Sequence, residues 1–422
     1  MKITYITHSC IMVKIANTVI LTDPWLTGPC WGGDLWHFPK HNFNLKTMPK
    51  PDIIFFSHGH DDHFHENSIK SFPKSWMNSL IIAPKFGVSW WENEVNKKFN
   101  NSIFFNHNEK KILKGIEFQI FINDKGDFDS SLKIKKGSST VFFQTDNLMS
   151  FKEANRISKL GKIDFAFLMP FQHGCYPGFF KMSLDEKIKE LNKKTLNSMD
   201  YSANICKRLS AKFTIPYACD LAHMGKNFFL NFIDPGDKKN YLHYLTTKKL
   251  KTKGVILNSG DCIIKKDKKV IINKTPYIHK DSKFLDFYNK NLNEYNSLIQ
   301  KDAKIKKYKL LKAPSIFKKK LKDNLGEIKP INFFVKLKIL DTNSKKITSI
   351  ILDLNKKLLL KKRNKLDLII EINNNKIANL LDGKYPMNFL TFHNGGFIAE
   401  RFTKNYSNKE KQFWNWIYNI QF

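Results

Sequence analysis

A run of histidines and aspartates at residues 57–65 (SHGHDDHFH) is the part of the sequence best suited to chemistry. In an extended backbone, residues two apart face the same way, so His58 and His60 can converge on one cation. The glycine between them permits a tight turn. Asp62 and His63 begin the following turn and can address a second cation beside the first. Imidazole and carboxylate ligands suit zinc, iron or manganese, so the run predicts a site for one or two divalent metal ions.

The neighbouring segments predict where this run lies in a fold. It follows an apolar segment, Pro51–Ser57, that is typical of a strand buried on both faces, and it precedes a segment with a helical pattern, Glu66–Phe72. Strands with helices between them recur through the first half of the chain, which predicts an α/β fold. A strand end with four convergent polar side chains would be a poor core, because it would bury unpaired polar groups.

The spacing H-x-H-x-D-H after an apolar strand resembles the metallo-β-lactamase superfamily. The resemblance covers about residues 1–275 and implies an α/β fold, a four-layer αβ/βα sandwich with metal at the edge of its central sheets. Within the superfamily, Thr22–Pro29, Asp129–Leu132 and Pro216–His223 resemble a branch that contains L-ascorbate-6-phosphate lactonase and the C-terminal part of CMP-N-acetylneuraminate hydroxylase.

The resemblance implies a set of metal ligands, matched residue by residue: His58, His60, Asp62, His63, Asp146 and His223. Asp146 follows an apolar strand, where the superfamily places a bridging aspartate, and a carboxylate can bridge two cations because it has two oxygens. An Asx turn at a strand end is the alternative for Asp146. His223 lies where the family places its last histidine, and a loop histidine bonded within its own loop is the alternative there. Asp62 and Asp146 are also the candidate catalytic residues, because either can orient a water.

The chain departs from the superfamily pattern between the main run and Asp146. Most hydrolases of the superfamily add a histidine in this interval, which here contains only His65 and His107. His107 lies in a polar segment that is typical of an exposed turn. Asp124 or Asp127 can supply an oxygen ligand instead. An oxygen ligand would favour iron or manganese over zinc at the first position.

Three segments flank the expected site and are candidates for substrate binding. Trp25 and Trp36 lie in or beside a loop rich in glycine and proline, where aromatic faces suit stacking on a sugar, base or acyl group. The alternative is that these aromatics only pin their own loop. His173 and Tyr176 follow another apolar run, and loops at strand ends are where α/β folds place ligands. His8, at the end of the first predicted strand, is expected beside them.

The composition narrows the class of protein. The 422 residues include 71 lysines and arginines against 38 acidic residues, a formal net charge of +33. Only four of the basic residues are arginines, although base readout and bidentate phosphate binding favour arginine. The lysine excess therefore predicts a solvated surface, or a field that attracts a small anionic substrate such as a sugar or nucleotide-sugar, and it argues against a nucleic-acid partner.

The sequence lacks several features that would indicate a membrane, a secretory or a zinc-knuckle protein. No segment reaches the ~18 apolar residues that span a membrane, and the first residues lack the apolar core of a secretory signal. The six cysteines form no C-x-x-C pair, which argues against a zinc knuckle or a Rieske cluster within this chain. We expect a soluble, cytoplasmic protein with no membrane partner.

The pattern along the chain predicts three parts. Residues 1–275 form the metal-binding domain, residues 276–330 a lysine-rich helical connector, and residues 331–422 a small α+β domain of unknown role. The connector contains two lysine-dense runs and one expected helix. Alternating apolar residues return after it and indicate strands, and the end of the chain is rich in tryptophan.

Three functions are compatible with these residues. In the first, a metal-activated water attacks an anionic ester, lactone or phosphodiester. In the second, suggested by the resemblance, an iron-dependent hydroxylase-like enzyme acts on an N-acyl sugar or sugar nucleotide and takes electrons from a separate donor, because this chain has no Rieske cysteines. The third is a basic nucleic-acid-binding protein without catalysis.

Overall fold

Two large sheets pack face to face in the computed structural model, which describes residues 1–171, 174, 176–277, 283–341, 347–383, 397–402 and 407–420. The eight-stranded sheet has the order β17 (Lys269–Asn273), β16 (Cys262–Lys266), β1 (Lys2–Thr7), β2 (Cys10–Ile15), β3 (Thr18–Thr22), β5 (Ile53–Phe55), β6 (Leu80–Pro84), β7 (Ser102–Phe105). The seven-stranded sheet has the order β15 (Lys253–Gly254), β13 (Phe213–Pro216), β12 (Phe165–Leu168), β11 (Ser139–Phe143), β10 (Ser130–Lys136), β9 (Ile116–Ile122), β8 (Lys110–Leu113).

Helices cover the outer faces of both sheets and complete the four layers of the predicted αβ/βα sandwich. One hydrophobic cluster fills the space between the sheets and includes Ile20 of the first and Val141 of the second. A second cluster packs α1 (Glu66–Lys70) and α2 (Ser89–Lys98) on the first sheet. A third packs α3 (Phe151–Lys159) and α4 (Leu184–Leu209) on the second sheet. The predicted fold class is confirmed.

The strand directions bring distant loops to one edge of the sandwich. β3, β5, β6 and β7 run parallel, as do β11, β12, β13 and β15. All three residues of β5 are buried, as expected for an apolar strand covered on both faces. β10 is antiparallel to β11, so the start of β10 lies beside the end of β11. The hydroxyl of Ser130 donates to the carbonyl oxygen of Ser57 (2.8 Å) and links the two sheets there.

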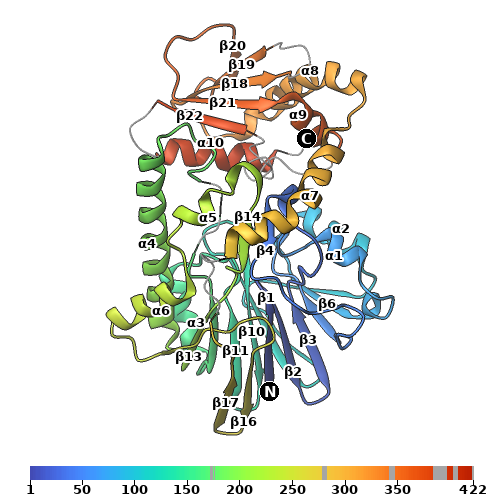
Figure 1. Ribbon diagram of the computed structural model, residues 1–422, viewed down its shortest axis with the longest axis vertical. Coiled ribbons are helices and arrows are strands. Elements are labelled where there is room, and N and C mark those ends of the chain that lie inside the picture. The colour runs from blue at the N-terminus through green and yellow to red at the C-terminus, as the bar shows by residue number, and fades with distance from the viewer. Residues whose placement is uncertain are drawn as a thin grey trace.

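A five-stranded sheet with three helices, here called the C-terminal unit, lies above the sandwich in Figure 1. Its strands have the order β20 (Leu358–Leu360), β19 (Ile347–Asp353), β18 (Phe334–Leu340), β21 (Leu368–Asn373), β22 (Phe397–Arg401). Its helices are α8 (Lys307–Asn324), α9 (Asn374–Leu381) and α10 (Asn408–Asn419). The backbone of Ala399 in β22 bonds to Phe179 and Lys181, so a segment of the sandwich domain extends this sheet.

The remaining elements are short segments and helices outside the three larger sheets. They are η1 (Trp31–Gly33), β4 (Leu35–His37), η2 (Trp76–Asn78), β14 (Leu221–His223), η3 (Gly225–Asn227), α5 (Leu230–Ile233), α6 (Lys238–Thr247), α7 (Phe284–Ala303) and η5 (Leu325–Glu327). β4 pairs with β14, and α7 packs on η1. The predicted boundaries at residues 275 and 330 stay predictions.

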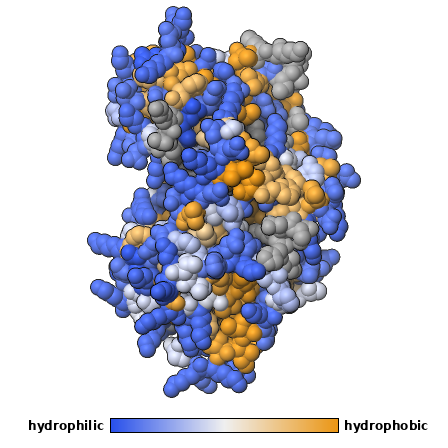
Figure 2. All heavy atoms as spheres, turned by 60° about the vertical axis from the view of Figure 1, so that its left-hand side comes forward, coloured by the Kyte–Doolittle hydropathy of each residue, from blue (hydrophilic) through white to orange (hydrophobic). Residues whose placement is uncertain are grey.

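One face of the molecule is mostly polar (Figure 2). On the face shown in Figure 2, hydrophilic residues predominate, and hydrophobic residues gather at the waist between the two units and on the lower part of the sandwich. Within the described ranges, no helix combines the length and the hydropathy needed to cross a bilayer.

Candidate metal centre

The ligand-bearing residues meet at one edge of the sandwich. His58, His60, Asp62 and His63 lie in the loop between β5 and α1. Asp146 follows β11, Asp129 directly precedes β10, and His8 lies in the turn between β1 and β2. Three groups bring their ligand atoms within 4.8 Å of one another: His58, His60 and Asp129; His58, His63 and Asp146; His8, Asp62 and His63. The groups share His58 and His63, so they form one continuous cluster.

At one end of the cluster, which we call the first position, two imidazoles face two carboxylates. The Nε2 of His58 lies 2.8 Å from the Nδ1 of His60 and 3.6 Å from the Oδ1 of Asp129. The Oδ2 of Asp146 lies 3.8 Å from the first of these nitrogens and 3.9 Å from the second. Such separations suit atoms that share one cation.

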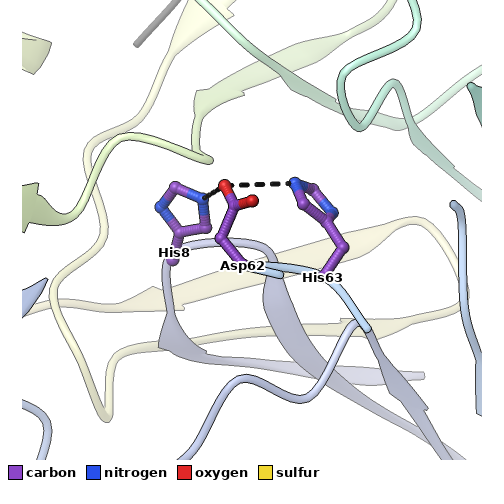
Figure 3. Close-up of side chains that lie close together, drawn as sticks. All are labelled: His8, Asp62 and His63. Carbon is purple, nitrogen blue, oxygen red and sulfur yellow. Dashed lines mark ion pairs between the residues drawn. The ribbon is translucent and has the colours of Figure 1, made fainter. Parts of the chain in front are cut away.

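At the other end, the second position, Asp146 presents its other oxygen. Its Oδ1 lies 3.2 Å from the Nε2 of His63, and the Oδ2 of Asp62 lies 3.7 Å from the same nitrogen. The same Oδ2 lies 3.3 Å from the Nε2 of His8 (Figure 3). Asp146 therefore faces both positions, one oxygen to each, which is the arrangement of a bridging carboxylate.

A buried aspartate orients His63 toward the centre. The Oδ2 of Asp23 accepts from the Nδ1 of His63 (2.9 Å) and from the hydroxyl of Ser57 (2.7 Å), and its Oδ1 accepts from the backbone N–H of Ser57 (2.8 Å). The Nε2 of His63 is buried and makes no hydrogen bond of good geometry among the described residues. Histidines that bind metal are commonly held by a carboxylate on their other nitrogen. This donor set fits a divalent metal ion.

The loop that contains η1 holds Asp62, the acidic residue at the second position. The indole N–H of Trp31 donates to the Oδ1 of Asp62 (2.9 Å), and its backbone N–H donates to the Oδ2 of Asp61 (2.5 Å). The ring of Trp31 also lies 5.5 Å from the ring of His60. One buried side chain thus contacts ligands of both positions.

Burial and charge set the protonation of the cluster. Burial lowers the pKa of His58 well below its usual value, and the neighbouring rings add to this effect. Burial opposes ionisation of Asp146, but the surrounding histidines, His63 first, hold its pKa well below the usual range. Burial also opposes the charge of His63, and the carboxylates around it raise its pKa. Burial raises the pKa of Asp129 to about 7. His58 is therefore a neutral ligand at neutral pH, and Asp146 is ionised.

Five of the six predicted ligands lie in this cluster, and His223 lies in none of its groups. The Nδ1 of His223 is 3.3 Å from the Oδ2 of Asp34, and its backbone N–H donates to Asn231. Asp34 also accepts from the side chain of Asn227. His223 thus pairs with a carboxylate outside the three groups.

The tryptophans predicted to bind substrate are engaged inside their own region. Trp25 is fully buried, donates to the carbonyl oxygen of Gly28 (2.8 Å) and stacks on His37 (3.8 Å between ring centroids). Trp36 donates to the carbonyl oxygen of Gly33 (2.7 Å) and is 7% exposed. Both tryptophans therefore stabilise the loop through their own hydrogen bonds, and Trp25 has no exposed face for a substrate.

The other predicted substrate residues differ in position. The hydroxyl of Tyr176 donates to Glu190 of α4 (2.7 Å), and Arg401 of β22 lies over its ring. His8 lies in the metal cluster. His173 lies outside the described residues.

Asp129 lies between His63 and Asp146 in the sequence and joins His58 and His60 in one group, and the sequence interpretation missed it as a ligand. Asp124 instead accepts from the backbone N–H of Ser150 (2.7 Å), and neither Asp124 nor Asp127 belongs to a group. His107 is exposed and bonds to the carbonyl oxygen of Ile122. The signal for Asp129 was its position directly before a strand that pairs antiparallel with the strand leading to Asp146.

The chain is similar in sequence to known proteins. Residues 2–147 match the family model of the beta-lactamase superfamily domain. The cytidine monophosphate-N-acetylneuraminic acid hydroxylase of Asterias rubens is 41% identical over 66 residues, 15% of this chain and 10% of that protein. The hydroxylase of Pongo pygmaeus is 24% identical over 229 residues, 51% of this chain and 38% of that protein. The chain therefore spans well under half the length of the curated relatives it matches.

Solved structures with a similar arrangement include Igni18, a metallo hydrolase of Ignicoccus hospitalis, with 15% identity, a TM-score of 0.43, and coverage of 65% of this chain and 98% of that one. CmlA, a diiron β-hydroxylase of Streptomyces venezuelae, has 14% identity, a TM-score of 0.44, and coverage of 64% of this chain and 54% of that one.

The chain thus has a metallo-β-lactamase fold, and residues 2–147 are similar to the beta-lactamase superfamily domain. Within that class it is related to the cytidine monophosphate-N-acetylneuraminic acid hydroxylases. A fold of this class implies divalent metal ions, and the His and Asp groups described above are suited to hold them.

Proposed function

We propose that the protein is a metal-dependent hydrolase of an anionic ester, lactone or phosphodiester-type small molecule. The observation that supports this best is Asp146, which offers one oxygen to His58 and His60 and the other to His63. A bound divalent cation lowers the pKa of a coordinated water to about 7 and so supplies a nucleophile at neutral pH.

Different residues of this chain would hold the two cations and orient the water. His58, His60 and Asp129 would hold the first cation, and Asp62 and His63 the second. The Oδ2 of Asp62 faces the second position, and its Oδ1 accepts from the indole N–H of Trp31. Asp146 is then the carboxylate that reaches both positions and can also orient a water between them. The net charge of +33 would raise the local concentration of an anionic substrate.

A second function has support from one observation, the carboxylate of Asp129 at the first position. Oxygen ligands favour iron or manganese over zinc. The chain would then be an iron-dependent hydroxylase-like enzyme on an N-acyl sugar or sugar nucleotide, with electrons from a separate donor. The relationship to enzymes named as hydroxylases supports the same alternative.

Metal content and oxygen dependence test these two functions together. The protein is purified anaerobically without chelators, beside His58→Ala and the control His243→Ala, which changes an exposed histidine of α6. Zinc or manganese that is lost only in His58→Ala, with hydrolysis of ester, lactone or bis-aryl phosphate probes in the absence of oxygen, supports the hydrolase. Iron, with oxygen consumption that requires a reductant and no hydrolysis, supports the hydroxylase. Native protein that binds no metal overturns both.

A further inference from the structure

We propose that His8 is a ligand of the cation at the second position, in the place that the superfamily pattern assigns to His223. This inference rests on the metal centre of the proposed function. Three independent features of His8 support it: the position of its ring, the lack of another partner for that ring, and the conformation of its backbone.

The ring of His8 lies where a third ligand of the second position is needed. Figure 3 shows the carboxylate of Asp62 between the rings of His8 and His63. Its Oδ2 is 3.3 Å from the Nε2 of His8 and 3.7 Å from the Nε2 of His63. Ligands about 2.1 Å from a tetrahedral cation lie roughly 3.4 Å apart. With Asp146, these residues would give the second position four donors.

No other partner explains the burial of this imidazole. His8 is 2% exposed, and neither of its ring nitrogens makes a hydrogen bond of good geometry to any residue that the structure describes. Buried polar atoms are nearly always satisfied, so an imidazole of this kind indicates a ligand. Asp62 alone is 3.3 Å away, and its other oxygen already accepts from Trp31.

The backbone of His8 lies in the left-handed region, which is uncommon outside glycine although histidine is among the residue types enriched there. Its φ is +43°, in the left-handed region that costs energy for any residue with a Cβ. Its carbonyl oxygen accepts from the backbone N–H of Ala218 (3.0 Å) and from the hydroxyl of Tyr5 (3.2 Å), and Trp25 packs edge-on against its ring. Such strain gathers where the surrounding structure imposes a functional geometry.

His223 is a matched comparison. It too is buried, and it too has one ring nitrogen 3.3 Å from a carboxylate oxygen, that of Asp34. The difference is that Asp34 belongs to none of the three groups and is itself bonded to Asn227. The two histidines therefore allow substitutions of equal chemistry with opposite expected results.

The test compares His8→Gly with His223→Gly by titrating metal-free protein with Co²⁺ and with Mn²⁺. Glycine accepts the positive φ of residue 8 and leaves room for free imidazole. We expect His8→Gly to lose about tenfold or more in affinity for one of two cations, to change the visible spectrum of bound Co²⁺, and to recover both with added imidazole. We expect His223→Gly to bind both cations as the native protein does.

Other outcomes separate this inference from the proposed function. One outcome is that His8→Gly binds two cations with native affinity and spectrum while His58→Ala loses metal. This outcome would overturn the assignment of His8 and would not contradict the proposed hydrolase. Loss of one cation in His223→Gly alone would restore His223 as the ligand. His8→Asn, in which the side chain tolerates the left-handed region, serves if the glycine variant does not fold. Native protein without affinity for either metal would overturn the proposed function itself.

Discussion

The substitution Asp23→Asn tests whether the metal centre depends on the orientation of His63. Asp23 is fully buried and accepts three hydrogen bonds, two from Ser57 and one from the Nδ1 of His63 (2.9 Å). Asparagine keeps one acceptor oxygen and turns the other side of the group into a donor. The Nδ1 of His63 must then accept, which moves the ring proton to Nε2, the atom that faces Asp146 and the second position. A protonated nitrogen cannot bind a cation.

The expected size of the effect follows from the role of such supporting residues. Removing a carboxylate that holds a metal-binding histidine typically lowers metal affinity about 10–100-fold. This corresponds to about 1.4–2.8 kcal/mol at about 1.4 kcal/mol per tenfold change. The metal-free protein should also lose roughly 1.5–3 kcal/mol of unfolding free energy, because a charge-assisted hydrogen bond is lost inside the core.

A competition titration against a chromophoric chelator measures the affinity, and thermal melting in chelator measures the stability. The matched control is Asp52→Asn, which changes a carboxylate that accepts from the backbone N–H of Val19 but touches no residue of the cluster. We expect native metal affinity in the control. If Asp23→Asn melts as a folded protein and binds metal within about twofold of the native affinity, the reasoning about the tautomer of His63 is refuted.

Three further results follow from the site. Asp129→His gives the first position a third imidazole, so selectivity for zinc over manganese should rise in a two-metal competition, and unchanged selectivity would contradict the oxygen-donor argument. Trp31→Phe removes the indole N–H that donates to Asp62, so affinity at the second position should fall by about tenfold, whereas Trp416→Phe, which removes an indole hydrogen bond within the C-terminal unit, should leave it unchanged. Affinity should fall as pH falls through about 7, because a cation must displace the protons that Asp129, with its pKa of about 7, and His63, with its raised pKa, retain in the free protein. Calorimetry in buffers of different protonation enthalpy measures the number of protons released on metal binding. A metal affinity that does not change with pH would contradict the prediction.

The parts of the site that depend on local sequence could be predicted. Four of the ligands lie within six residues of one another directly after a strand: His58, His60, Asp62 and His63. Their spacing and the alternation of side chains along an extended backbone are enough to place them together. Apolar runs that became strands were also visible. The buried parallel strands β5, β6 and β12 have a continuous apolar pattern, and the antiparallel strands β1, β2 and β9 have apolar or alternating patterns.

Residues that reach the site through strand pairing could not be predicted in the same way. Asp129 contacts His58 only because β10 pairs with β11 in one register and Ser130 bonds to Ser57 across the two sheets. A shift of one residue would turn Asp129 to the other face. Asp23 lies 40 residues before His63 and meets it because β3 and β5 are neighbours. The sequence also offers Asp124 and Asp127 near Asp129, and spacing alone does not show which of the three reaches His58.

The C-terminal unit and the metal centre meet at the loop of Trp31, and this contact gives the unit a physical link to the chemistry. Trp31 belongs to the same hydrophobic cluster as Phe317 of α8. Gly33 of the same loop packs against α7, where a Cβ would be in van der Waals contact with Leu298 at 3.5 Å. The indole of Trp31 meanwhile holds the Oδ1 of Asp62. A change that loosened the packing of α7 or α8 on this loop would therefore act at the second position, because Asp62 would lose the hydrogen bond from Trp31 that fixes its Oδ1.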